Sequence, residues 1–226
     1  MSTPPSKPTP ARRDIFTEYV ATNHERMIVR YPDDDDGRLG RCFAEAADRL
    51  ADTHEGRAHD DALLMPFLYL YRHAIELDLK HSIRFAVRLR RNNAEDDPRL
   101  EESAVGERLK RKHGHRLMAL VAELDAHMQV LGFDPLPRDI RRTFELISTT
   151  DKNGESFRYT GTLAKDQDFI DFGRLAYALK SAYQLCSAAS DMLSVYEDGQ
   201  LDMLAHQQAL EAEYAADLRA EFEDYY

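Results

Sequence analysis

The feature that most constrains the fold is an uninterrupted helical pattern over residues 62–91. Its apolar residues recur every three or four positions and form one stripe: Leu68, Tyr71, Ile75, Leu79, Ile83 and Ala86. This period is typical of a helix that buries one face. Pro66 suits a first turn, where the missing N–H would have no intrahelical partner in any case. We therefore expect one long helix at the centre of the molecule.

The rest of the chain repeats this pattern with few helix breakers, since it contains only 10 Gly and 9 Pro in 226 residues. Further helices are predicted at 13–30, 38–55, 99–112, 115–131, 137–148, 166–197 and 200–223. Gly132 is a natural helix C-cap, and Asp198–Gly199 is expected to separate the last two helices. Asn153–Gly154 favours a short β-hairpin or an ordered loop near 148–160. The predicted fold class is all-α.

Composition divides the chain into four expected parts. Residues 1–12 are rich in proline and predict a disordered leader, and 13–61 predict N-terminal helices that pack on the core. The core is expected over 62–197, and 198–226 form an acidic C-terminal helix. No apolar run approaches the ~18 residues that span a membrane, and no secretory signal is visible, so we expect a cytoplasmic protein without a membrane partner. Cys42 and Cys186 are expected to be buried structural thiols.

Charge is unevenly distributed along a chain whose formal net charge is −11. The segment from Arg72 to Arg116, here called the basic island, contains 12 Lys/Arg and 8 Asp/Glu, a net charge of +4. From Glu197 to the end there are 9 acids and only Arg219. The overall charge argues against nucleic-acid binding by the whole surface, so any anion site is expected in the basic island.

One row of charges in the basic island follows i, i+4 spacing along the predicted central helix. It consists of Arg72, Glu76, Lys80, Arg84 and Arg88. Neighbours four apart are close on a helix surface, so the row can be a solvated set of ion pairs. The row is only cationic after Glu76, and like charges cost stability unless an anion or acidic partner offsets them. An anion-binding face is the alternative interpretation.

A second basic cluster lies around the turn at Gly114. Its candidate site residues are Arg108, Arg111, His113, His115 and Arg116. Guanidinium groups bind phosphate oxygens in a bidentate way, so the cluster predicts a phosphate site. Two histidines without a neighbouring cysteine or carboxylate set are weak evidence for a metal site, so we expect neither a metal nor another cofactor.

Three short motifs resemble the HEPN superfamily of helical bundles associated with nucleotides and RNA. They are RHAIELDLK at 72–80, HGHRLMALV at 113–121 and FRYT at 157–160. Arg116 stands where the family usually has Asp, and Thr160 where Pro is common. The resemblance implies a HEPN-like bundle with extra terminal helices, RNA or nucleotide as partner, a homodimer, and Arg158 and Tyr159 as binding residues. A protein partner is a further expectation.

The resemblance also implies ribonuclease activity as one expectation, because many HEPN proteins are similar to toxin or antiphage-defence RNases with an Arg-x4–6-His motif. Arg108 with His113, or Arg108 with His115, fits that spacing. Histidine could move the proton of a 2′-OH and arginine could stabilise the phosphorane charge, without a metal. The late helix at 166–197, where such a motif is expected, has no histidine. Two hypotheses follow: a metal-independent endoribonuclease, or a non-catalytic module that binds nucleotide, RNA or protein.

Overall fold

The computed structural model describes residues 27–28, 34–159 and 169–223. The chain divides into two units, Met1–Asp34 and Asp35–Tyr226, and the second carries every described helix. All of the predicted leader and most of the predicted helix at 13–30 lie outside the described residues. Residues 27–28, which are described, are not helical. Across the described part of the chain the fold is all-α, as predicted, with no β-strand.

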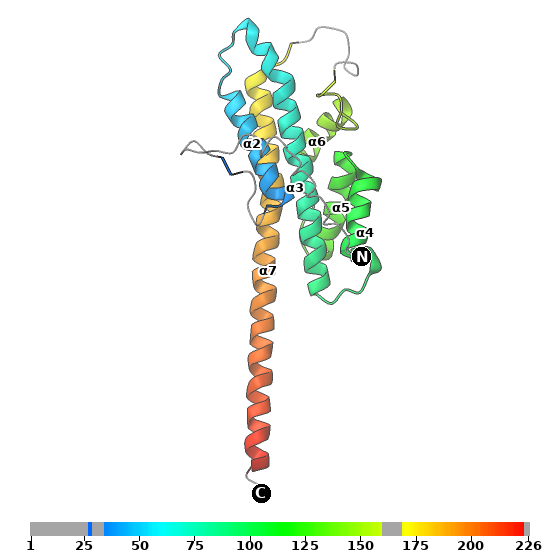
Figure 1. Cartoon of the computed structure of the whole chain (residues 1–226), viewed down its shortest axis with the longest axis vertical. Coiled ribbons are helices and arrows are strands. Elements are labelled where there is room, and N and C mark those ends of the chain that lie inside the picture. The colour runs from blue at the N-terminus through cyan, green and yellow to red at the C-terminus, as the bar shows by residue number, and fades with distance from the viewer. Residues whose placement is uncertain (1–26, 29–33, 160–168, 224–226) are drawn as a thin grey trace, which may run out of the picture. The chain divides into compact units, whose positions relative to one another are not determined.

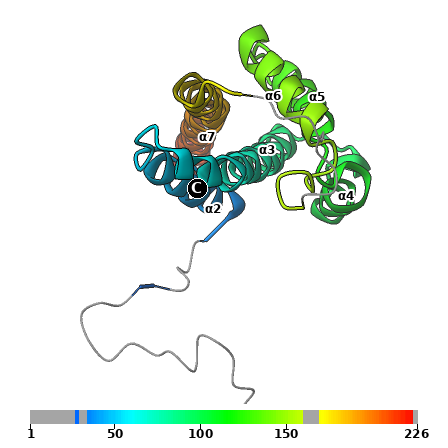
Figure 2. The same cartoon turned by 90° about the horizontal axis from the view of Figure 1, so that it is seen from above.

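Helix α3 (Leu64–Asn92) is the central element of the second unit (Figure 1). Figure 2 shows α2 (Asp36–Ala51) and α7 (Phe172–Glu223) together on one side of α3, and α4 and α5 on the other. The predicted apolar stripe of α3 is confirmed as core, because its central members are fully buried: Tyr71, Ile75, Leu79, Ile83 and Ala86. The long 3.6-residue repeat thus specifies the helix on which the others pack.

Shorter elements follow α3. They are η2 (Pro98–Leu100), α4 (Glu102–Glu107), a π-helical turn η3 (Arg108–His113), α5 (Leu117–Val130) and α6 (Arg138–Thr150), with η1 (Ala58–Leu63) before α3. The single weak helix predicted at 99–112 is therefore divided into three pieces. The predicted C-cap at Gly132 is confirmed, since Gly132 has φ +85° and the next N–H bonds to the Met128 carbonyl.

Helix α7 is one continuous helix, so the predicted break at Asp198–Gly199 is wrong. A single glycine within a helix costs only about 1 kcal/mol relative to alanine. The turn after it is also held to α3, because Gln200 Nε2 donates to the Leu89 carbonyl at 3.0 Å and to Asn93 Oδ1 at 2.6 Å. These contacts outweigh the weak local preference for a break.

Of the two alternatives predicted near 148–160, the β-hairpin is not seen among the described residues and the loop is. The residues described there form the end of α6 and a turn-rich loop at 151–159. Gly154 does adopt the left-handed conformation that the Asn-Gly pair predicts, with φ +79°. No ladder follows, because the Asp151 carboxylate accepts the backbone N–H groups of Glu155 and Ser156 at 2.7 and 3.0 Å. Such side-chain to backbone bonds compete directly with strand pairing.

Both cysteines are free, but only Cys186 is buried; Cys42 is exposed, which corrects one half of that prediction. Cys42 lies on the solvent side of the strongly amphipathic α2, whose buried residues are Gly37, Gly40, Ala44 and Ala47. Among the helices described, none is both long and apolar enough to cross a membrane.

Candidate functional site

The predicted charge row of α3 does not lie on one surface. A step of four residues turns about 40° past a full helical turn, so four steps from Arg72 to Arg88 rotate the row by about 160°. Arg72 and Glu76 are accordingly buried, with side-chain exposures of 3% and 2%. Arg84 and Arg88 are about half exposed. The first half of the row is therefore buried in the protein, and the second half lies at the surface.

The first half of the row forms a buried ionic cluster centred on Glu76. The Glu76 carboxylate lies 2.7 Å from Arg72 Nη1, 2.7 Å from Lys80 Nζ and 2.9 Å from His115 Nδ1. Burial raises the pKa of Glu76, but Lys80 and Arg72 outweigh it and hold the pKa below its usual value. Three residues predicted from the central helix and one from the second cluster thus converge.

Asp151 completes this cluster from the loop after α6. Its Oδ2 lies 2.6 Å from Arg72 Nε, at an angle that makes the contact an ion pair rather than an aligned hydrogen bond. Arg72 Nη2 also donates to the backbone carbonyl of His115. Arg72 therefore ties α3 to the loop at 151–159 and to the turn before α5. Its environment is that of a structural anchor, with little surface left for a ligand.

Arg158 and Tyr159 lie on the rim of this cluster. Arg158 Nε donates to the Gly154 carbonyl at 2.8 Å, and its guanidinium carbon lies 5.9 Å from the Tyr69 ring centre. The Tyr69 ring stacks in parallel on His73 at 5.8 Å. Burial lowers the pKa of His73, which favours its neutral form. The structure thus places Arg158 beside the Tyr69 and His73 rings, and the Arg158 guanidinium carbon also lies 5.5 Å from the Tyr159 ring centre.

The second predicted cluster is directed mainly into the protein. Arg108 Nε donates to Glu123 Oε1 at 2.8 Å, and His113 Nε2 contacts Glu123 Oε2. Burial raises the pKa of Glu123, but His127, Arg108 and His113 outweigh it and lower the pKa to about 2. His113 and Arg108 are largely buried. The two residues of the Arg-x4-His spacing do meet, but on an internal carboxylate.

The remaining predicted cations are at the surface. Arg111 pairs with Glu107 within the same helical stretch at 2.7 Å. Arg116 is the N-cap residue of α5, without a side-chain cap, and its Nε donates to the His113 carbonyl at 3.3 Å. The Glu76 carboxylate contacts neither of these two arginines; its partners are Arg72, Lys80 and His115. Of the second cluster, only His115 joins residues of the first.

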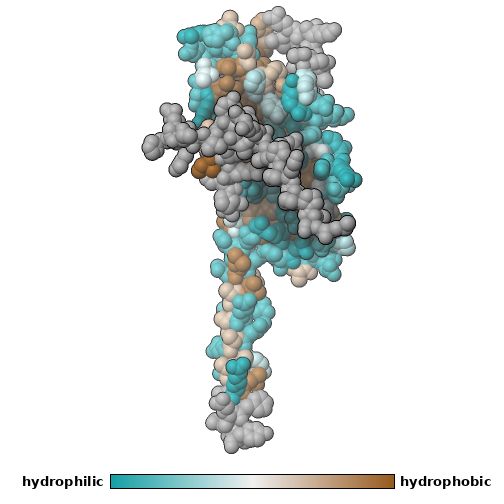
Figure 3. All heavy atoms as spheres, viewed as in Figure 1, coloured by the Kyte–Doolittle hydropathy of each residue, from teal (hydrophilic) through white to brown (hydrophobic). Residues whose placement is uncertain are grey.

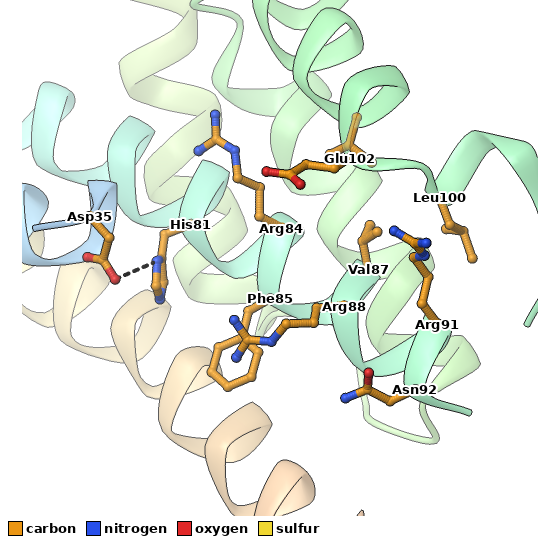
Figure 4. A pocket seen from close by; sticks show the side chains of 11 residues that line it. Asp35, His81, Arg84, Phe85, Val87, Arg88, Arg91, Asn92, Leu100 and Glu102 are labelled. Atoms are coloured by element: carbon orange, nitrogen blue, oxygen red, sulfur yellow. Dashed lines mark ion pairs between the residues drawn. The ribbon is translucent and has the colours of Figure 1, made fainter. Parts of the chain in front are cut away.

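The second half of the α3 row lines a groove of about 590 Å³ (Figure 4). We call it the arginine groove. It is lined by Asp35, His81, Arg84, Phe85, Val87, Arg88, Arg91, Asn92, Leu100, Glu102 and Val105. In Figure 4 the three arginines come from successive turns of α3 and line one side of the hollow, with their guanidinium groups pointing in different directions. Four of the lining residues were not predicted from the sequence: His81, Phe85, Arg91 and Asn92. The spacing of Arg84, Arg88 and Arg91 on one helix was a usable signal.

Each arginine of the groove has an acidic neighbour outside α3. Arg84 pairs with Asp36 of α2, Arg88 with Glu197 of α7 at 2.9 Å, and Arg91 with Glu101 at 3.5 Å. All three guanidinium side chains remain about half exposed, at 46, 58 and 46%. Arg88 also lies over the Phe85 ring at 4.4 Å. The groove therefore offers accessible but partly neutralised cations.

Within the described ranges, no group of three His, Cys, Asp or Glu side chains gathers in a way that could hold a metal ion. Comparison with known proteins gives no match: no protein-family model, no curated protein and no solved structure corresponds to this chain.

Proposed function

We propose that this chain is a HEPN-like helical module that binds phosphate groups of RNA or a nucleotide in the arginine groove, without catalysing their cleavage. The observation that carries the proposal is that Arg84, Arg88, Arg91 and His81 all line one groove. Arginine is suited to this role because its planar guanidinium donates two parallel hydrogen bonds to phosphate oxygens.

The size and lining of the groove support a nucleotide-sized ligand. Its volume of about 590 Å³ falls within the range of roughly 300–1,000 Å³ that is common for small-molecule sites. Phe85 and Val87 supply apolar surface, and Asn92 supplies an amide that can bond a base edge. The groove thus combines cations for phosphate with apolar and amide groups for a base.

A phosphate that binds in the groove would have to replace the acidic neighbours of the arginines. Exposed ion pairs contribute only about 0–1 kcal/mol each, so a phosphate that makes bidentate contacts can replace them. Asp35 and Glu102, which also line the groove, limit its positive charge. We therefore expect modest affinity that falls as salt concentration rises.

Binding can be measured by fluorescence anisotropy with a labelled short single-stranded RNA and with labelled ATP, at low and at physiological salt. Arg88→Gln with Arg91→Gln should weaken binding at least tenfold, since two charge-assisted contacts are lost. Arg49→Gln is the matched control, because Arg49 is an exposed α2 arginine paired with Glu45 and does not line the groove. Equal affinity of the double variant and the wild type would refute the proposal.

One contact favours a second candidate function, a metal-independent endoribonuclease in which His115 moves the proton. Its Nδ1 is held by the buried Glu76, while the side chain is 56% exposed. A carboxylate that fixes one imidazole nitrogen leaves the other free for proton transfer. RNA incubated with the chain in EDTA tests this: cleavage that His115→Ala abolishes would support a toxin or defence nuclease. RNA that stays intact leaves the non-catalytic proposal.

A further inference from the structure

The second half of α7 has exposed apolar side chains with no covering element among the described residues. From Leu201 to Arg219 every residue is exposed. Figure 3 shows apolar side chains between hydrophilic ones on the part of α7 beyond the bundle. Most helical stability in proteins comes from packing an apolar face rather than from intrinsic helix propensity. This segment therefore lacks the packing that would stabilise it.

Three of the exposed side chains share one face. Met203, Leu210 and Tyr214 are seven and four residues apart, spacings that return to the same side of a helix, and they are 76, 52 and 67% exposed. Seven- and four-residue steps are also those of a helix that packs along another helix. We call these three residues the α7 stripe.

Acidic residues flank the α7 stripe on both sides. Glu211 follows Leu210 by one position and Glu213 precedes Tyr214 by one, so they lie about 100° to either side of the stripe. Over residues 197–219 the helix has six acids and only Arg219. Flanking charges of this kind select the partner of a packed helix.

We propose that the α7 stripe is a docking surface for a basic amphipathic helix of a partner protein. Leucine-like side chains of the partner would cover the α7 stripe, and its lysines or arginines would face Glu211 and Glu213. A second copy aligned in parallel would instead place these acids against their own equivalents, and like charges at such positions destabilise the pair. The charge pattern therefore favours a basic partner, and the proposal is independent of the arginine groove.

The probe for this proposal is a fluorescein-labelled synthetic helix of four heptads, with Leu at positions a and d and Lys at e and g. A second peptide has Glu in place of Lys. The full-length chain should bind the Lys peptide at least tenfold more tightly than the Glu peptide, and affinity should fall as salt concentration rises. Met203→Ser with Leu210→Ser should weaken Lys-peptide binding at least tenfold.

The matched control is Leu201→Ser with Leu204→Ser. These leucines are 57 and 52% exposed but lie about 100° or more around the helix from Met203. The control should bind as the wild type does, although it retains the same charges and suffers a similar loss of helix propensity. Equal binding of both double variants would overturn the proposal. So would self-association in sedimentation velocity that Met203→Ser with Leu210→Ser abolishes, because the occupant would then be a second copy.

Discussion

Arg72 Nε lies 2.6 Å from Asp151 Oδ2, and the two side chains are 3% and 1% exposed. This ion pair joins the middle of the central helix to the loop after α6. The same guanidinium contacts Glu76 at 2.7 Å, so one buried cation is shared by two buried carboxylates. Removal of one partner from such a cluster leaves a buried charge without full compensation.

Asp151→Asn is therefore expected to lower the free energy of unfolding by about 3–5 kcal/mol. Urea unfolding followed by circular dichroism measures the change. Asp202→Asn provides the control, because Asp202 is an exposed acid on α7 and should change stability by no more than about 0.5 kcal/mol. A loss below 1 kcal/mol for Asp151→Asn would show that the pair does not anchor the loop.

Gly154 is required by two features of the same loop. Its φ of +79° disfavours any residue with a Cβ, and a Cβ there would lie 3.0 Å from the Arg72 guanidinium carbon. Gly154→Ala should destabilise the protein by about 1–2 kcal/mol from the backbone alone. Gly106→Ala is the opposite case: it lies in α4 with open space around it, so the same change should stabilise by up to about 1 kcal/mol. Thermal unfolding of both variants should shift in opposite directions.

Asp78 is a buried acid between α3 and α7. It is 3% exposed, its Oδ2 has no hydrogen-bond partner among the described residues, and burial raises its pKa to about 6. The Cys186 thiol forms a hydrogen bond with the Asp78 carboxyl group. Burial raises the pKa of that thiol well above its usual value. Arg41, Asp191, Asp35 and Tyr183 are the other titratable neighbours. Burial therefore extends the neutral form of Asp78 to higher pH, and this form predominates below about pH 6.

This raised pKa predicts a pH dependence of defined sign. The folded pKa of about 6 exceeds the unfolded value of 3.8, so the folded state binds the proton more tightly. The Asp78 contribution to stability is thus fully present below pH 3.8 and is lost as pH rises through 6. Asp78→Asn should remove this loss and stabilise the protein at pH 8 by about 1–3 kcal/mol. Urea unfolding at pH 5 and pH 8 checks it; equal gains at both pH values would contradict the assignment.

The contribution of Glu123 to stability should have the opposite pH dependence to that of Asp78. The Glu123 pKa of about 2 lies below the unfolded value of 4.5, so its contribution is present above pH 4.5 and is lost as pH falls toward 2. Glu123→Gln should lower the free energy of unfolding at pH 7 by on the order of 2–3 kcal/mol, because Arg108 and His113 lose their shared carboxylate. The difference between variant and wild type should shrink when unfolding is repeated at pH 3. A constant difference would mean that the lost charge is not its cause.

Much of the fold could be predicted from the sequence, because the formation of a helix and the choice of its buried face depend on residues close together in the chain. Apolar residues at a 3.6-residue period specify a helix and its buried face, and α3 has the predicted stripe in its core. Gly132 ends α5 as expected, because only a residue tolerant of positive φ fits there. The helix break predicted at Gly199 is wrong. Glycine costs a helix only about 1 kcal/mol relative to alanine, and the contacts of the next turn with α3 outweigh this cost.

The sequence by itself determined that the protein is helical and that its cations concentrate between Arg72 and Arg116. Only the tertiary structure decided which of them are buried. The rotation of about 40° for each step of four residues separates Arg72, held by Glu76 and Asp151, from Arg88, which lines the arginine groove. Glu123 on α5 likewise contacts Arg108 and His113, which lie on the preceding π-helical turn, and these contacts keep both side chains largely buried. Sequence spacing gives neighbours along one helix, whereas the carboxylates that neutralise a cation come from whichever helix packs beside it.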